Sequence, residues 1–204
     1  MTLRTPALLL LALLSAPLAL SQDSSGPAYH IEIIIFRALS TQGGPENWSA
    51  EGAAANVVGE ESSSGSSQVG HFVGLLPPAQ FQMTDLEARL RASGAYAPVA
   101  HVAWAQTASA WGTRAGFTLQ KLGIDVQGLT GNVSLERGQY LHLGMALSYV
   151  IASPPAGLGA TAGTAFALTE SRRVHFYERN YYDNPAYGVI ALVTPAQGAR
   201  PAGR

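Results

Sequence analysis

Residues 140–151 alternate apolar side chains with small or polar ones along most of their length. The apolar positions are Leu141, Leu143, Met145, Leu147, Tyr149 and Ile151, and Tyr140, His142, Gly144, Ala146 and Ser148 lie between them. A period of two is typical of a β-strand that buries one face. Residues 129–136 precede it across a turn that contains Gly138, so the two segments predict a hairpin. We therefore expect a fold built around antiparallel sheet.

Four further segments predict strands. Residues 29–36 are rich in β-branched and aromatic side chains, and apolar residues occupy both faces, so we expect a central strand covered on both sides. Residues 98–104 and 188–193 are also strand candidates. Residues 165–181 predict one long strand whose inward side chains include Phe166, Leu168, Val174 and Phe176. Glu170 and Arg172 would share that inward face and would need partners.

One helix is predicted, and it begins at Thr84. The sequence Thr84-Asp85-Leu86-Glu87 matches a capping box, in which the first and last side chains bond each other's backbone N–H. Leu86 and Leu90 would lie on the buried side, and Gly94 is a suitable stop.

These elements predict an α+β fold with a single, mostly antiparallel β-sheet and one or two short helices. Residues 22–195 would form one domain. A low-complexity, Ser/Gly-rich loop would span about residues 40–82, with its Ser-rich part disordered, and residues 196–204 would form a disordered tail.

The first 21 residues predict a secretory signal peptide. Arg4 precedes an almost pure Leu/Ala run, and Ala19 and Ser21 are small residues at the positions that a signal peptidase recognises. The apolar run of about 14 residues is shorter than the roughly 20 needed to span a membrane. We expect export, cleavage before Gln22, and a mature form without a transmembrane segment.

Composition argues against several classes of function. The chain has no Cys, which excludes disulfides and thiolate sites, and its formal net charge of −1 does not suggest nucleic-acid binding. The five His are spaced 30 to 41 residues apart and show no metal-ligand spacing. No His-Glu-x-x-His or Gly-x-Ser-x-Gly motif occurs, although sequence alone does not exclude a catalytic triad. We therefore expect binding without catalysis, metal or cofactor.

An ordered set of residues along the chain resembles the CsiV family of gammaproteobacterial periplasmic proteins. The set comprises residues 29–36, Glu46-Asn47-Trp48, Ser93, Tyr96, His101, Trp104, Gln106, Tyr140-Leu141-His142-Leu143, Glu170-Ser171-Arg172-Arg173, Glu178, Tyr182-Asp183-Asn184-Pro185 and Gly188. Gln139 stands where the family usually has Arg, and Asn184 where it usually has His. The resemblance implies a non-enzymatic, peptidoglycan-binding periplasmic protein. It also implies an accessory role in cell-wall synthesis, together with a penicillin-binding protein and its outer-membrane lipoprotein activator.

Peptidoglycan presents sugar faces, amides and carboxylates, which suit aromatic and arginine side chains. The outward face of residues 165–181 would carry Arg173, His175, Tyr177 and Arg179, and a neighbouring strand would add Tyr140 and His142. We expect these six residues to form the ligand-binding surface. Alternatively, they only cover an exposed sheet face, or the helix packs on them.

Other functions stay open at this point. The chain could be a protein-interaction module that takes a partner by strand addition and never binds glycan. It could also be a cell-wall hydrolase, or a secreted domain whose resemblance to the family extends only to the fold.

Overall fold

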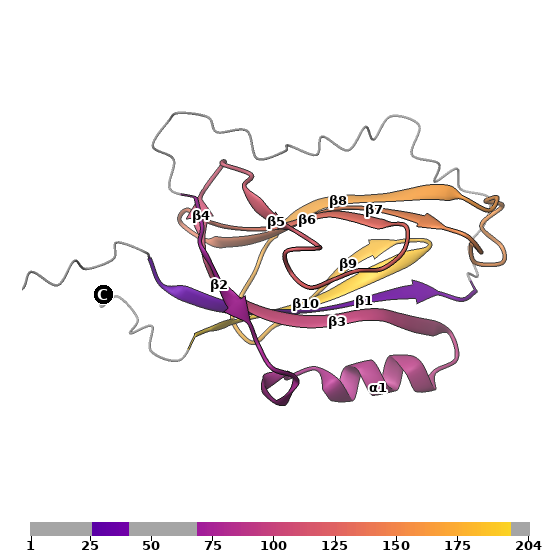
Figure 1. Ribbon diagram of the computed structural model, residues 1–204, viewed down its shortest axis with the longest axis horizontal. Helices are drawn as coiled ribbons and strands as arrows, with labels where there is room; N and C mark the ends of the chain where they lie inside the picture. Colours follow the sequence, from indigo (N-terminus) through magenta and orange to yellow (C-terminus); the bar gives the residue numbers. More distant parts are fainter. Residues whose placement is uncertain (1–25, 41–68, 197–204) are drawn as a thin grey trace, which may run out of the picture.

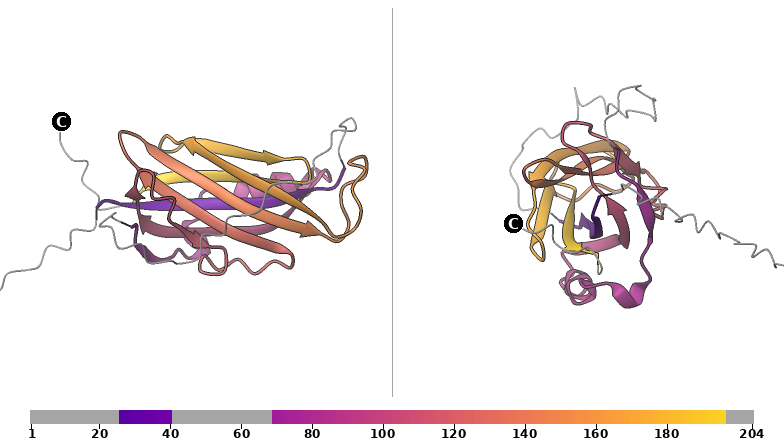
Figure 2. Two further views of the ribbon diagram at one scale, coloured as in Figure 1. Left: turned by 90° about the horizontal axis from the view of Figure 1, so that it is seen from above. Right: turned by 90° about the vertical axis from the view of Figure 1, so that its left-hand side faces the viewer.

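The computed structural model describes residues 26–40 and 69–196, and within these ranges two sheets pack face to face with one α-helix outside (Figures 1 and 2). The first sheet has the order β2-β3-β1-β10-β9, with β1 at Ala28–Ala38, β2 at Phe72–Leu75, β3 at Tyr96–Thr107, β9 at Arg179–Asn184 and β10 at Tyr187–Pro195. The second has the order β4-β6-β7-β8, and β5 also pairs with β6. Its strands are β4 at Ser109–Ala110, β5 at Gly116–Thr118, β6 at Leu129–Arg137, β7 at Leu141–Ile151 and β8 at Thr164–Arg173.

The expected mostly antiparallel fold with few helices is confirmed, but the expected single sheet is wrong. One short helix could cover only a small part of a sheet with so many apolar strands. A second sheet buries the remaining apolar face, which is why the domain has two β layers.

One hydrophobic core fills the space between the sheets. Ile31, Ile33 and Ile35 of β1 point into it, as do Leu143 and Met145 of β7, and each is at most 2 % exposed. Each buried Ile contributes roughly 1.5–3 kcal/mol to folding. The predicted alternation of residues 140–151 and the predicted β6–β7 hairpin are both confirmed.

β1 is a central strand with both faces covered, as its sequence predicted. On the face opposite the main core, Ile34 and Phe36 join a smaller apolar cluster with Met83 and Leu192. The helix α1, at Thr84–Ala92, lies over this cluster, and Leu86 and Leu90 pack against it. In Figure 1, α1 accordingly runs along the outer side of the first sheet.

The start of α1 differs from the predicted capping box. Met83 is the N-cap residue, and no side chain caps the helix. The backbone N–H groups of Gln82 and Met83 instead donate to the carboxylate of Glu32 on β1, at 2.7 and 2.8 Å. The predicted stop is confirmed, because Gly94 follows the helix with a φ of 67°.

The predicted long strand at 165–181 is two strands in two different sheets. β8 ends at Arg173, and the chain then crosses to β9, which begins at Arg179. Tyr177 has a φ of 65°, a left-handed conformation that lies outside the β region of a continuous strand. Glu170 and Arg172, which were expected to share the inward face and to need partners, pair with each other.

Several predicted features lie outside the described residues. These are the signal peptide at 1–21, the Ser-rich part of the predicted loop, the Glu46-Asn47-Trp48 segment and nearly all of the 196–204 tail. The described end of the predicted loop contains β2 and a 3-10 turn, η1, at Pro78–Gln80. Among the described residues, no helix is long and apolar enough to cross a membrane.

Gly188 of β10 lies beneath two aromatic rings of the first sheet. Phe36 and Tyr181 stack with their ring centroids 6.1 Å apart, and Tyr96 contacts Phe36 edge-on at 5.2 Å. A Cβ on Gly188 would lie 2.7 Å from a ring carbon of Phe36 and 2.9 Å from one of Tyr181. The absence of a side chain at Gly188 is therefore what lets both rings lie against the strand.

We expect Gly188→Ala to lower the free energy of unfolding by about 1–3 kcal/mol, because both rings must move away from the strand. Gly74→Ala on β2 is the matched control, since a Cβ there meets nothing within 4 Å, and its effect should stay within about 0.5 kcal/mol. Urea unfolding of the two variants measures this difference. Equal effects would show that the ring contact does not constrain the strand.

Candidate functional site

Four side chains meet at one end of the second sheet, in what we call the aromatic–arginine cluster: Trp111, Tyr140, His142 and Arg173. Trp111, Tyr140 and Arg173 are exposed, and His142 is half-buried between its neighbours. His142 of β7 lies directly opposite Arg173 of β8 in the strand register. Residues paired in this way project from the same face of a sheet. Because Leu141 and Leu143 face the core, Tyr140 and His142 face away from it. The cluster therefore lies on the outer face of the second sheet.

The cluster is held together by ring contacts. The rings of Trp111 and His142 are 4.2 Å apart between centroids, and the guanidinium carbon of Arg173 lies 3.5 Å from the ring centroid of Tyr140. Trp111 is 57 % exposed and Tyr140 is 41 % exposed. The exposed rings of Trp111 and Tyr140 therefore remain accessible to a ligand on either side of the His142–Arg173 pair.

The loop that carries Trp111 is fixed to the end of β6. The backbone N–H of Trp111 donates to the carbonyl of Arg137 at 3.2 Å. The carboxylate of Glu136 accepts hydrogen bonds from the backbone N–H of Arg114 and the hydroxyl of Thr113, which fold the loop over the sheet. A Cβ on Gly138 would lie 3.1 Å from the Cβ of Trp111. These contacts set the position of the indole before any ligand arrives.

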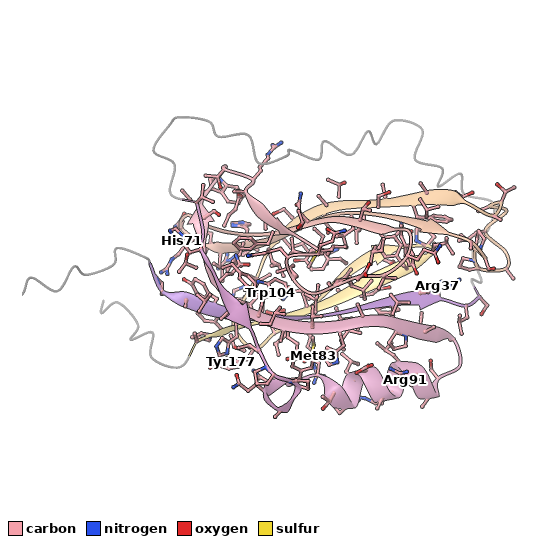
Figure 3. All side chains as sticks on the ribbon, viewed as in Figure 1. Arg37, His71, Met83, Arg91, Trp104 and Tyr177 are labelled. Atoms are coloured by element: carbon pink, nitrogen blue, oxygen red, sulfur yellow. The ribbon has the colours of Figure 1, made fainter. Side chains whose placement is uncertain are left out.

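The structure brings three of the six predicted site residues together, Tyr140, His142 and Arg173. His175 and Tyr177 are exposed on the crossing segment between the two sheets, at the same end of the molecule, where Figure 3 labels Tyr177. Arg179 is elsewhere, because its guanidinium is 3.9 Å from the carboxylate of Asp85 on α1, beside the first sheet. The single binding face predicted from sequence is therefore divided between the two sheets.

Trp111 was not found by sequence reasoning. It follows the two-residue strand β4 and precedes Gly112, so no periodic pattern marks it. Trp111 is an isolated large aromatic residue in a segment of small and polar residues, and a single exposed apolar residue is too common to mark a binding site.

The two departures from the family pattern differ in their surroundings. Gln139 is exposed in the turn before Tyr140, beside the cluster. Asn184 donates from its side-chain nitrogen to the carbonyl of Ala167 at 2.9 Å and accepts from the N–H of Ala186 at 3.1 Å. Asn184 thus connects the β9–β10 turn to the second sheet.

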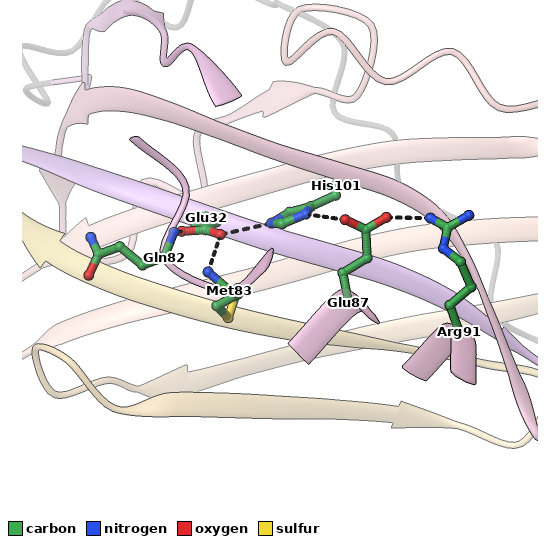
Figure 4. A network of polar contacts seen from close by, with 6 residues as sticks. All are labelled: Glu32, Gln82, Met83, Glu87, Arg91 and His101. Atoms are coloured by element: carbon green, nitrogen blue, oxygen red, sulfur yellow. Dashed lines mark hydrogen bonds and ion pairs between the residues drawn. The ribbon is translucent and has the colours of Figure 1, made fainter. Parts of the chain in front are cut away.

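A second group of polar residues lies on the opposite side of the molecule, between α1 and β3 (Figure 4). His101 contacts Glu32 through Nε2 at 2.7 Å and Glu87 through Nδ1 at 2.8 Å. Glu87 also accepts from Arg91 at 2.5 Å. The side chains of Glu32 and His101 are 5 % and 6 % exposed. This network connects β1, β3 and α1.

A pocket of about 350 Å³ opens beside the network, with Phe81 and Pro98 among its lining residues together with Glu87, Arg91 and His101. The charged atoms on its wall already bond one another, and the ring of Phe81 lies 4.7 Å from that of His101. The geometry therefore favours an anchor for α1 over a site with a free acid or base. Among the described residues, no cluster of His, Asp and Glu could hold a metal ion.

The charge of His101 depends on these two carboxylates. Burial alone would lower the pKa of His101, but the hydrogen bonds and charges of Glu32 and Glu87 outweigh it, so the pKa is raised. The hydrogen bond from His101, with a further one from Arg91, lowers the pKa of Glu87 despite partial burial. An ionised carboxylate only accepts hydrogen bonds, so the doubly protonated ring satisfies both contacts.

We expect the stability of the protein to fall as the pH rises above neutrality. The stabilisation from protonated His101 is complete below its ordinary pKa of about 6.5 and is lost as the pH passes the raised value of the folded state. His101→Gln should remove this loss, whereas His71→Gln, at an exposed residue, should retain it. Urea midpoints at pH 6 and pH 9 measure the difference. If the urea midpoint of His101→Gln fell between pH 6 and pH 9 as much as that of the wild type, protonated His101 would not be what anchors α1.

The family comparison agrees with the resemblance seen in the sequence. A family model described as "Peptidoglycan-binding protein, CsiV" matches residues 6–196. No curated protein and no solved structure matches the chain closely enough to support a comparison. The match covers nearly the whole chain, including every described residue from β1 to β10. The chain therefore belongs to the CsiV family of peptidoglycan-binding proteins.

Proposed function

We propose that this protein binds peptidoglycan without cleaving it, through the aromatic–arginine cluster. The observation that carries the proposal is the exposure of Trp111 and Tyr140 on one sheet face, each in contact with a polar planar side chain. The apolar faces of sugar rings stack on aromatic rings, and imidazole and guanidinium groups bond hydroxyls and amides. The family description supports the same ligand.

The form of the surface suits a polymer. Next to the cluster, the row formed by Ser134, Gly144 and Ser171 crosses the three main strands of the second sheet. These short side chains leave the outer face flat beside the aromatic rings. A glycan strand could therefore lie across the sheet instead of ending in a closed pocket.

The surroundings of the cluster support binding without hydrolysis. A glycosidase needs two carboxyl groups free to act on the scissile bond. Glu136 is the carboxylate in the same cross-strand row as His142 and Arg173, and it is buried and already bonded by the loop that carries Trp111. Glu170 pairs with Arg172. A cell-wall hydrolase is therefore the less favoured function.

We further propose that the protein acts in the periplasm, after export directed by residues 1–21. There it would support a penicillin-binding protein and its outer-membrane lipoprotein activator, as the family resemblance implies. A second exposed aromatic surface supports this role: Tyr96 and Tyr181 flank Phe36 on the outer face of the first sheet, away from the cluster. That face could contact a protein while the cluster holds glycan. In a module that binds only proteins, it would carry the activity alone.

We expect the double variant Trp111→Ala/Tyr140→Ala to lose most of its pelleting with purified sacculi, because both stacking surfaces are removed. Losing two stacking contacts of about 0.5–1.5 kcal/mol each would weaken binding by about five- to 150-fold. Tyr96→Ala is the matched control, since Tyr96 is similarly exposed but lies on the other sheet, and it should pellet like the wild type.

The supernatant of the same assay distinguishes the alternatives. Release of soluble fragments by the wild type would contradict a non-enzymatic role. Full pelleting of the double variant would exclude the cluster as the binding surface. Pelleting lost only in Tyr96→Ala would move the activity to the first sheet.

A further inference from the structure

The arginine of the cluster differs from nearly all other described arginines in having no hydrogen-bond acceptor. Six arginines bond or pair with an acceptor, namely Arg37 with Ser153, Arg89 with Asp85, Arg91 with Glu87, Arg137 with Tyr29, Arg172 with Glu170 and Arg179 with Asp85. Within the described ranges, Arg114 and Arg173 have none, and Arg114 also has no ring contact to hold its side chain. Of the eight arginines that the structure describes, Arg173 is therefore the one that a ring holds in place and that pairs with no acceptor.

We propose that Arg173 binds a carboxylate of the peptide stems of peptidoglycan, next to a sugar ring stacked on Trp111. This rests on the proposed function and specifies its ligand as peptide-bearing glycan. The sugars of an intact, stem-bearing strand carry no free carboxylate, because the lactyl group of each substituted sugar is tied to its peptide. The carboxylates all belong to the stems, so an arginine receptor selects for them.

The contact with Tyr140 prepares Arg173 for this role. A guanidinium carbon 3.5 Å from a ring centroid lies against the ring face, and stacking leaves the N–H donors at the guanidinium edge available. Those donors match the two oxygens of a carboxylate in a bidentate pair. Holding the side chain in place before binding also reduces the conformational entropy lost when the ligand arrives.

The local charge favours the same ligand. Glu136 is buried beneath the loop at residues 113–114, and Glu170 pairs with Arg172. Neither carboxylate reaches Arg173 in the structure, so its positive charge is not neutralised by them. Arg173 and His142 are cross-strand partners, which places the carboxylate receptor directly beside the ring that contacts Trp111.

The test compares untreated sacculi with sacculi whose carboxylates have been converted to amides by carbodiimide and ammonia. This treatment leaves the glycan strands and their length unchanged. We expect wild-type pelleting to weaken by about tenfold or more on amidated sacculi, because a charge-assisted bidentate pair is lost. Arg173→Gln should bind both preparations with the same reduced affinity.

Arg172→Gln is the matched control, because Arg172 is the adjacent residue but is already paired with Glu170. It should still discriminate between the two preparations. If the wild type pellets equally with both, the carboxylate proposal is wrong while the proposed function stands. If Arg173→Gln still discriminates, another residue binds the carboxylate. If the wild type pellets with neither, the proposed function itself fails.

Discussion

The burial of alternate residues along β7 is the constraint on which the rest of the structure depends. Leu143, Met145 and Leu147 close the core against the first sheet, so the residues between them must face outward. Cross-strand pairing then places Arg173 beside His142, and the turn before β7 presents Tyr140 on the same face. A one-residue slip of β7 would move this whole set of side chains to the other face of the sheet. The position of the candidate binding surface is thus a consequence of how the core packs.

The outer faces of the two sheets differ in what they carry. Among the described residues, no helix covers the outer face of the second sheet, which carries the aromatic–arginine cluster. The outer face of the first sheet is covered in part by α1, which a buried charge network holds through Glu32 and His101. Several residues of the family pattern lie in such structural contacts: Trp104 donates to Gln106 inside the core at 2.6 Å, and Tyr182 donates to the carbonyl of Leu143. A shared family residue therefore often supports the fold and not the ligand site.

Sequence reasoning succeeded where the signal is local. The period of two in β7, the β-branched residues of β1 and the glycine after α1 each depend on neighbours in the chain. It failed where the deciding contact is distant or has no sequence mark. Glu32 reaches the start of α1 from 51 positions away, and the left-handed Tyr177 ends a strand pattern that otherwise continues. The same crossing separates Arg179 from Tyr140, His142 and Arg173. The sequence pattern of one continuous strand gave no sign of this separation. Trp111 completes the cluster from a loop without periodicity.

Hydrogen–deuterium exchange of the protein with and without soluble peptidoglycan fragments tests the central claim most directly, because it locates the bound surface without substitutions. We expect slower exchange at residues 110–114, 138–142 and 171–173, with little change in α1 and β3. Slower exchange confined to α1 and β3, beside the pocket at His101, would contradict the assignment of the aromatic–arginine cluster as the peptidoglycan-binding surface.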